Sequence, residues 1–153
     1  MRPIIVAFAF FIVAAGCALT GARAADLSDP PGQAAGVDLA RAPALIAKRD
    51  WDGAIAELQR AARADPKSAD VHNLLGYSYR NAGRLDKAFG EYEIALRLDP
   101  KHKGAHEYVG EAYLLARQPE KAQEQLAKLK LICGGESCEE YQDLAKAIAA
   151  YKP

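Results

Sequence analysis

The chain has 153 residues, half of them hydrophobic, and its 20 lysines and arginines balance 20 aspartates and glutamates. This balance argues against a nucleic-acid-binding surface, which needs a basic stripe. The length fits one domain, the composition is that of a soluble helical protein, and a single tryptophan predicts no aromatic stacking platform.

Residues 1–24 have the pattern of an export signal. Arg2 supplies a positive charge, residues 4–15 are an unbroken apolar run, and Ala22-Arg23-Ala24 is a small-x-small cleavage site. The apolar run is too short to span a bilayer comfortably. An alternative stays open, because Ala14-Ala15-Gly16-Cys17 is similar to a bacterial lipoprotein box in which Cys17 would be lipidated. We therefore expect an exported chain, with membrane contact only through such a lipid or an uncleaved signal.

The next stretch changes from a leader to a helical pattern. Residues 25–37 contain an Asp-Pro-Pro-Gly turn and no apolar periodicity, which predicts a flexible leader. A weak helical stripe begins at Asp38, and Pro43 interrupts it, so we expect a late start or a kink there. Trp51 precedes a clearer helix over residues 52–64 and is expected to pack at the corner of this first hairpin.

Residues 69–100 contain two amphipathic segments with a break between them. Apolar residues recur at i, i+3, i+4 and i+7 in both segments, which is the pattern of helices rather than strands. Ser68 is placed to cap the first helix. Gly76 is small where the two helices must cross closely, and Tyr92 is large enough to fill the gap. The stretch is predicted to be a helix–turn–helix hairpin.

This pattern returns every 34 residues along the chain. A fixed period of this length predicts a stacked array, in which each unit buries its apolar face against its neighbours. The recurring positions are Ala54, Ala88 and Ala122; Asp65-Pro66 and Asp99-Pro100; and His72, Gly76 and Tyr79 with His106, Gly110 and Tyr113.

These positions resemble the tetratricopeptide repeat (TPR) family, whose pattern is W-x2-L-G-x2-Y, then A-x3-F, then P. His72 and His106 stand in the tryptophan place, and we expect both to be packing residues with a satisfied nitrogen rather than ligands. The resemblance implies an all-α, right-handed solenoid of about three hairpins with a C-terminal capping helix. It covers residues 38–134, as hairpins over about 38–66, 69–100 and 103–134, the last with Pro119 opening its second helix.

Two cysteines bracket a glycine turn after the last hairpin. In an exported protein, Cys133 and Cys138 are expected to form a disulfide that pins the capping helix over residues 138–151. Either glycine of the turn is suited to end the preceding helix in the left-handed conformation. Ser137 and Glu140 predict a capping box at the start of the capping helix. An alternative is a periplasmic thiol or metal protein using Cys133 and Cys138, since a cysteine at a helix N-terminus is reactive.

We find no sequence support for an enzyme. No serine–histidine–aspartate, paired-carboxylate or glycine-rich phosphate motif stands in a supporting context, so no catalytic residue and no cofactor are expected. Zinc is not expected either, because His102 and His106 would have to meet Cys133 and Cys138 from a distant part of the chain.

In stacked hairpins of this family, the first helix of each repeat lines an inner, concave groove. The resemblance therefore implies a peptide-binding strip of aromatic, charged and apolar side chains, with Tyr77 and Arg80 as anchors. Alternatively, Leu114 and Leu115 only pack against the last helix. The expected groove residues are Asp70, Asn73, Tyr77, Arg80, Asn81, Glu107, Glu111 and Leu114, with Leu115 beside them.

The function that follows is a non-enzymatic scaffold that binds a protein or peptide partner in the bacterial periplasm. Two alternatives stay open: a lipoprotein of an outer-membrane or secretion assembly, anchored through Cys17, and the thiol or metal protein described above. Neither a nucleic acid nor a small-molecule cofactor is expected as a partner.

Overall fold

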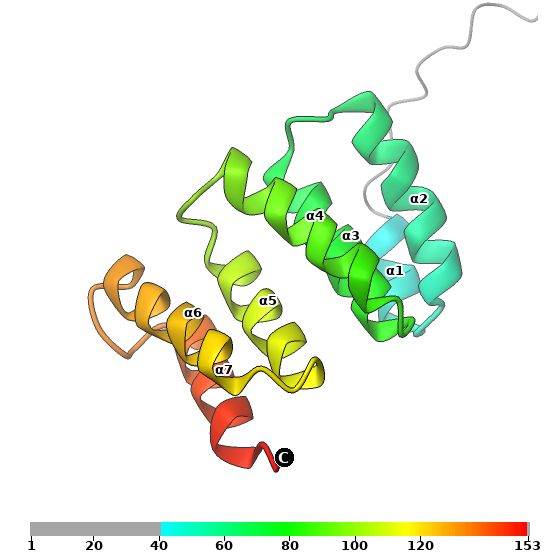
Figure 1. The fold of residues 1–153 in the computed structure, drawn as a ribbon. Coiled ribbons are helices and arrows are strands. Elements are labelled where there is room, and N and C mark those ends of the chain that lie inside the picture. The colour runs from blue at the N-terminus through cyan, green and yellow to red at the C-terminus, as the bar shows by residue number, and fades with distance from the viewer. Residues whose placement is uncertain (1–40, 153) are drawn as a thin grey trace, which may run out of the picture. The chain divides into compact units, whose positions relative to one another are not determined.

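A computed structural model describes residues 41–152, and this part of the chain is built from α-helices without strands (Figure 1). The expected signal peptide, leader and Cys17 lie outside the described residues, as does the expected helix start at Asp38. No helix in this part has the length and apolar character needed to cross a membrane.

The helices follow one another as three hairpins and a final single helix (Figure 1). Each hairpin pairs an odd-numbered helix with the even-numbered helix after it, and α7 packs on both α5 and α6. The prediction of about three hairpins with a C-terminal helix is therefore confirmed. The helices are α1 (Arg41–Ala47), α2 (Trp51–Ala64), α3 (Ala69–Asn81), α4 (Leu85–Leu98), α5 (Lys103–Leu115), α6 (Pro119–Ile132) and α7 (Glu139–Ala150).

Helix starts are set by short-range hydrogen bonds. The Ser68 hydroxyl accepts from the Val71 N–H at 3.3 Å, which confirms its predicted role as the N-cap of α3. His102, 34 residues later, does the same for α5 through Nδ1, which accepts from the Ala105 N–H at 3.1 Å. The His102 cap was not predicted from the sequence, although the 34-residue period places it opposite Ser68. Pro119 is the first residue of α6, where its missing N–H costs no helical hydrogen bond.

The turn inside each hairpin uses one residue in the left-handed conformation. The φ angles are +58° at Arg49, +74° at Gly83 and +58° at Arg117, one per hairpin at the same place in the period. Glycine adopts this conformation freely, whereas an L side chain is strained in it. Two of the three turns therefore carry an arginine where glycine would be less strained.

Close helix crossings occur at two equivalent glycines. A Cβ on Gly76 would lie 2.5 Å from Cε1 of Tyr92, which is fully buried, so the predicted crossing within the second hairpin is confirmed. A Cβ on Gly110 would lie 2.6 Å from Cδ2 of Leu144 on α7. The third hairpin thus receives a side chain from α7, which the sequence period did not predict.

The start of α7 differs from the predicted capping box. Cys138, not Ser137, is the N-cap, and no side chain caps the helix. The disulfide between Cys133 and Cys138 holds this position, with Cα atoms 6.0 Å apart, so the disulfide prediction is confirmed and the capping-box prediction is wrong. The preceding turn contains Gly134 with φ of +69° and Gly135 with φ of +152°, as expected of a glycine-ended helix.

The odd-numbered helices also contact one another: α3 packs against α5, and α5 against α7. Helices α4 and α6 cover the other side of these helices (Figure 1). We call the surface of α3, α5 and α7 that faces away from α4 and α6 the inner face.

Candidate functional site: the inner face

Three aromatic rings lie next to one another across successive repeats. The rings of Trp51 and Tyr77 meet edge to face with centroids 6.0 Å apart, and the rings of Tyr77 and Tyr108 are tilted with centroids 4.9 Å apart. All three side chains are partly exposed. We call these three residues the aromatic strip. Tyrosines from two helices thus extend the single tryptophan, with rings that meet edge to face or at a tilt rather than as a stacking platform.

The Arg80 side chain joins two repeats. Its guanidinium lies 5.2 Å from the Tyr77 ring centroid and 5.4 Å from that of Tyr108, within cation–π distance. It also forms an ion pair with Glu111 and donates to the Tyr108 carbonyl at 3.4 Å. The Arg80 side chain is only 9% exposed, so its charge is already satisfied within the protein. Arg80 therefore bridges α3 and α5 rather than standing free as a partner anchor.

Carboxylates gather on the same face between α5 and α7. Burial, together with the negative charges of Glu111, Asp143 and Glu140, raises the pKa of Glu107 to about 7, and Arg80 only partly opposes this shift. Burial likewise raises the pKa of the Tyr108 phenol to about 12. We call Glu107, Glu140 and Asp143 the acidic wall.

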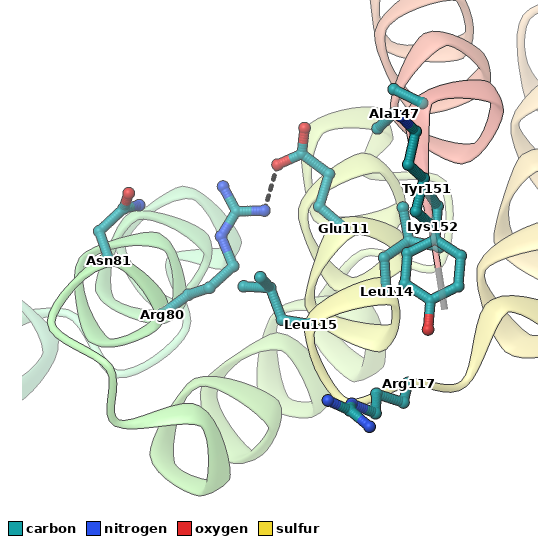
Figure 2. A pocket seen from close by; sticks show the side chains of 10 residues that line it. Arg80, Asn81, Glu111, Leu114, Leu115, Arg117, Ala147, Tyr151 and Lys152 are labelled. Atoms are coloured by element: carbon teal, nitrogen blue, oxygen red, sulfur yellow. Dashed lines mark hydrogen bonds and ion pairs between the residues drawn. The ribbon is translucent and has the colours of Figure 1, made fainter.

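A pocket of about 580 Å³ opens where the C-terminal ends of α3, α5 and α7 come together. Figure 2 shows Leu115 below the Arg80–Glu111 pair and Leu114 beside Tyr151. Leu115 is 64% exposed and lies next to the buried Leu114, so this pocket has apolar surface open to water. We call this the C-terminal pocket; its lining residues are Arg80, Asn81, Glu111, Leu114, Leu115, Arg117, Ala147, Ala150, Tyr151 and Lys152.

Comparison with protein families gives a match to the tetratricopeptide repeat model over residues 39–103. Residues 39–103 belong to the tetratricopeptide repeat (TPR) family. The matched residues span α1 to α4, and the third TPR hairpin, α5 and α6, follows them with the same 34-residue period.

Solved TPR structures share the fold. A structure of MamA (MSR-1, form C2) is 26% identical with a TM-score of 0.56; the match covers 61% of this chain and 53% of that one, so this chain spans about half of its length. The Sgt2 TPR domain from Aspergillus fumigatus is 20% identical, with a TM-score of 0.66 and coverage of 72% and 73%. The TPR2B domain of yeast Sti1 is 17% identical, with a TM-score of 0.66 and coverage of 76% and 98%. A comparison with curated proteins found no match.

The residues expected in the TPR groove do not all lie on its surface. Tyr77 and the two glutamates of α5 are partly exposed on the inner face, and Asn81 is exposed, with its amide donating to the Tyr77 carbonyl at 2.8 Å. Asp70 is exposed at the start of α3 and accepts from His102 Nε2 at 2.9 Å. These residues are placed where a partner could reach them, and their contact with a partner stays a prediction.

Asn73 and Leu114 differ from the expectation. Asn73 is only 6% exposed, because α5 of the next repeat approaches it: a Cβ on Gly104 would lie 3.2 Å from its amide nitrogen. Asn73 is thus an interface residue between repeats rather than a groove residue. Leu114 is 8% exposed and packs beside α7, which agrees with the alternative that it packs against the last helix. Leu115, for which the same alternative was open, is exposed.

Sequence reasoning missed several residues of the inner face. Tyr108 follows Glu107 directly, and a wider helical stripe on α5 would have included it. Arg117 could have been found from the period, since it stands 34 residues after Gly83 in the hairpin turn. Tyr151 belongs to the apolar stripe of the capping helix, but its place at the pocket, like that of the alanines of α7, depends on how that helix docks.

The two repeat histidines are packing residues, as predicted. His72 Nδ1 lies 2.7 Å from Glu91 Oε2, and His106 Nδ1 lies 2.8 Å from Gln125 Oε1. The Nε2 atoms lie 3.2 Å and 3.0 Å from the carbonyl of the proline six residues earlier. The histidine Nδ1 contact therefore joins α3 to α4 in the second hairpin and α5 to α6 in the third.

Metal-ligand residues meet at one place in the described part of the chain. Cys133, Cys138 and Glu140 bring one ligand-type atom each within 4.8 Å of the others. The two sulfur atoms are bonded to each other, so neither is a thiolate able to bind a metal. In this state, the cysteines position α7 and do not form a metal or thiol site.

Proposed function

We propose that this TPR chain is a non-enzymatic scaffold that binds a protein or peptide partner on its inner face. The observation that carries the proposal is the continuity of that face, where the partly exposed aromatic strip and the C-terminal pocket lie on neighbouring repeats. Tyrosine and tryptophan side chains bury a large area with little loss of conformational freedom, which is why they contribute strongly to binding energy at interfaces.

Peptide-bound structures of the same fold support this proposal. The first TPR of Spaghetti (RPAP3) is bound to an HSP90 peptide, SRMEEVD, and is 16% identical with a TM-score of 0.62, over 72% of this chain and 90% of that one. The Sti1 domain is a complex with pHsp70. At this level of identity the likeness supports a scaffold of this kind and does not carry over the partner.

The inner face can be tested by photo-cross-linking in cells. A photoreactive amino acid at Asn81 or Leu115 is expected to capture one discrete partner, identified by mass spectrometry. The control is Glu93, which is exposed on α4, outside the inner face. Capture from Glu93 alone, or from none of the three positions, would contradict a partner-binding inner face.

We further propose that the chain acts in the bacterial periplasm. Support comes from the charged start, apolar run and small-x-small site of residues 1–24. Intact-mass measurement of the chain from its native host is expected to show cleavage after Ala24. A diacylglyceryl mass on Cys17 would instead identify the lipid-anchored form, and an uncleaved chain in the cytoplasmic fraction would contradict export.

A further inference from the structure

The C-terminal pocket has an apolar floor, and two exposed cations, Arg117 and Lys152, lie at its rim. We propose that it binds an acidic segment of the partner, with a large apolar side chain in the pocket and a neighbouring Asp or Glu carboxylate at Arg117 or at Lys152. This inference rests on the proposed function and names the chemistry of the partner.

The apolar floor is built by two helices. Leu114 and Leu115 come from α5, and Ala147, Ala150 and Tyr151 come from α7 and its end (Figure 2). A volume of about 580 Å³ lies within the range of small-molecule sites and has room for one large side chain and its neighbours. The alanines of α7 leave this room, whereas larger side chains there would fill it. The exposed Leu115 gains most from being covered, because most of its surface is in water.

The charges around the pocket do not cancel. The Arg80 charge is neutralised by Glu111, so the cations left at the rim are Arg117 and Lys152. Neither of these two forms an ion pair with any carboxylate in residues 41–152. A carboxylate beside the apolar side chain would therefore meet a positive charge, either Arg117 or Lys152, without displacing an existing partner (Figure 2).

The acidic wall sets the direction of such a segment. Glu107 lies one turn before Glu111 on α5, on the side of the inner face away from the pocket, and it interacts with Glu140 and Asp143 on α7. Negative charges of the segment are repelled there and attracted at the pocket. An acidic segment thus has one favoured place on the inner face.

The turn of the first hairpin provides a matched control for Arg117. Arg49 has the same φ of +58°, is exposed, and stands at the same place in the period, but it does not line the pocket. Replacing either arginine by glycine changes the same backbone turn and the same charge. Only Arg117→Gly removes a charge from the pocket rim.

The experiment uses the mature full-length chain and three blocked peptides of twelve residues, acetylated and amidated. One peptide carries a central Leu-Asp-Glu, the second Leu-Lys-Lys and the third Ser-Asp-Glu in the same neutral background, and affinities are measured by isothermal titration calorimetry at low salt. We expect the first peptide to bind about tenfold or more tightly than the other two. Arg117→Gly should weaken this binding about fivefold, and Arg49→Gly should leave it unchanged.

Several results would overturn the inference. They are equal binding of the lysine peptide, equal loss in both arginine variants, or no binding by any of the three peptides. Photo-cross-linking from Asn81 separates this failure from failure of the proposed function. A partner captured there in the absence of acidic-peptide binding would leave the inner face as the binding surface and remove only the assigned chemistry.

Discussion

Arg80 lies between the rings of Tyr77 and Tyr108 and is paired with Glu111. Such a side chain stabilises the contact between two repeats, and its removal would leave Glu111 beside two electron-rich rings. An Arg80→Glu variant would place two carboxylates together and destabilise the array. Loss of partner binding in that variant would therefore report on folding, and exposed positions such as Asn81 are better probes of binding.

Glu107 predicts an unusual pH dependence of stability. Its pKa is about 7 in the folded chain and near 4.5 when unfolded, so the folded state binds more protons between these values. Stability contributed by the protonated carboxyl is therefore present below pH 4.5 and is lost as the pH rises through about 7. Glu107→Gln should remove this loss. At pH 8 we expect the variant to gain on the order of 1 kcal/mol in free energy of unfolding, after allowance for solvent screening of a half-exposed group.

Urea unfolding at pH 5 and pH 8 measures this difference. Glu93→Gln is the control, because Glu93 is exposed on α4 and far from the acidic wall. The explanation fails if Glu107→Gln changes stability equally at both pH values, or if Glu93→Gln shows the same gain at pH 8.

Gly76 and Gly90 predict opposite effects of the same substitution. A Cβ at Gly76 would collide with the fully buried Tyr92 ring, so Gly76→Ala should lower the free energy of unfolding by about 1–3 kcal/mol. Gly90 lies on the exposed side of α4, and a Cβ there would meet no atom within 4 Å, so Gly90→Ala should raise stability by about 0.5–1 kcal/mol. Thermal and urea denaturation followed by circular dichroism test both, and two changes of the same sign would contradict the crossing.

At the scale of the element, α7 is fixed to the array at two points. The disulfide holds its start, and the fully buried Leu144 lies against the backbone of α5 at Gly110. The closed loop is short, so the disulfide contributes only roughly 2 kcal/mol in the chain-entropy account. Leu144 is therefore at least as important for docking of α7 as the covalent link.

Leu144→Ala should reduce the free energy of unfolding by about 3 kcal/mol, because it leaves a cavity between α5 and α7. The loss should also open the C-terminal pocket, since α7 supplies one of its walls. Hydrogen exchange of the α7 amides is expected to accelerate more than that of α3. Lys146→Ala, an exposed change on the same helix, should stay within about 0.5 kcal/mol of the parent chain; equal effects of both variants would show that α7 is not held by Leu144.

At the scale of the whole molecule, the helices and their repetition could be predicted from the sequence. The i, i+3, i+4, i+7 stripes, the Ser68 cap and the Gly76 crossing depend on residues within one hairpin, where local rules decide. The 34-residue period then extends one hairpin to the next. This is why the packing role of His72 and His106 could be predicted from their equivalence alone.

Contacts between repeats could not be predicted in the same way. Asn73 and Glu107 occupy equivalent places, yet Asn73 is buried by α5 and Glu107 is half-exposed beside α7. The neighbours that decide this difference, Gly104 in one case and the acidic residues of α7 in the other, lie on the following repeat. The ion pair of Arg80 with Glu111 and the C-terminal pocket depend on the following helix in the same way. Neither could therefore be predicted from the sequence of one hairpin.

The central claim is that the inner face, rather than the outer helices, binds the partner. Hydrogen–deuterium exchange of the mature chain, with and without the partner identified by cross-linking, tests this most directly. Binding is predicted to slow exchange in the C-terminal halves of α3 and α5 and in α7, while α4 and α6 exchange as in the free chain. Slower exchange confined to α4 and α6 would contradict the account.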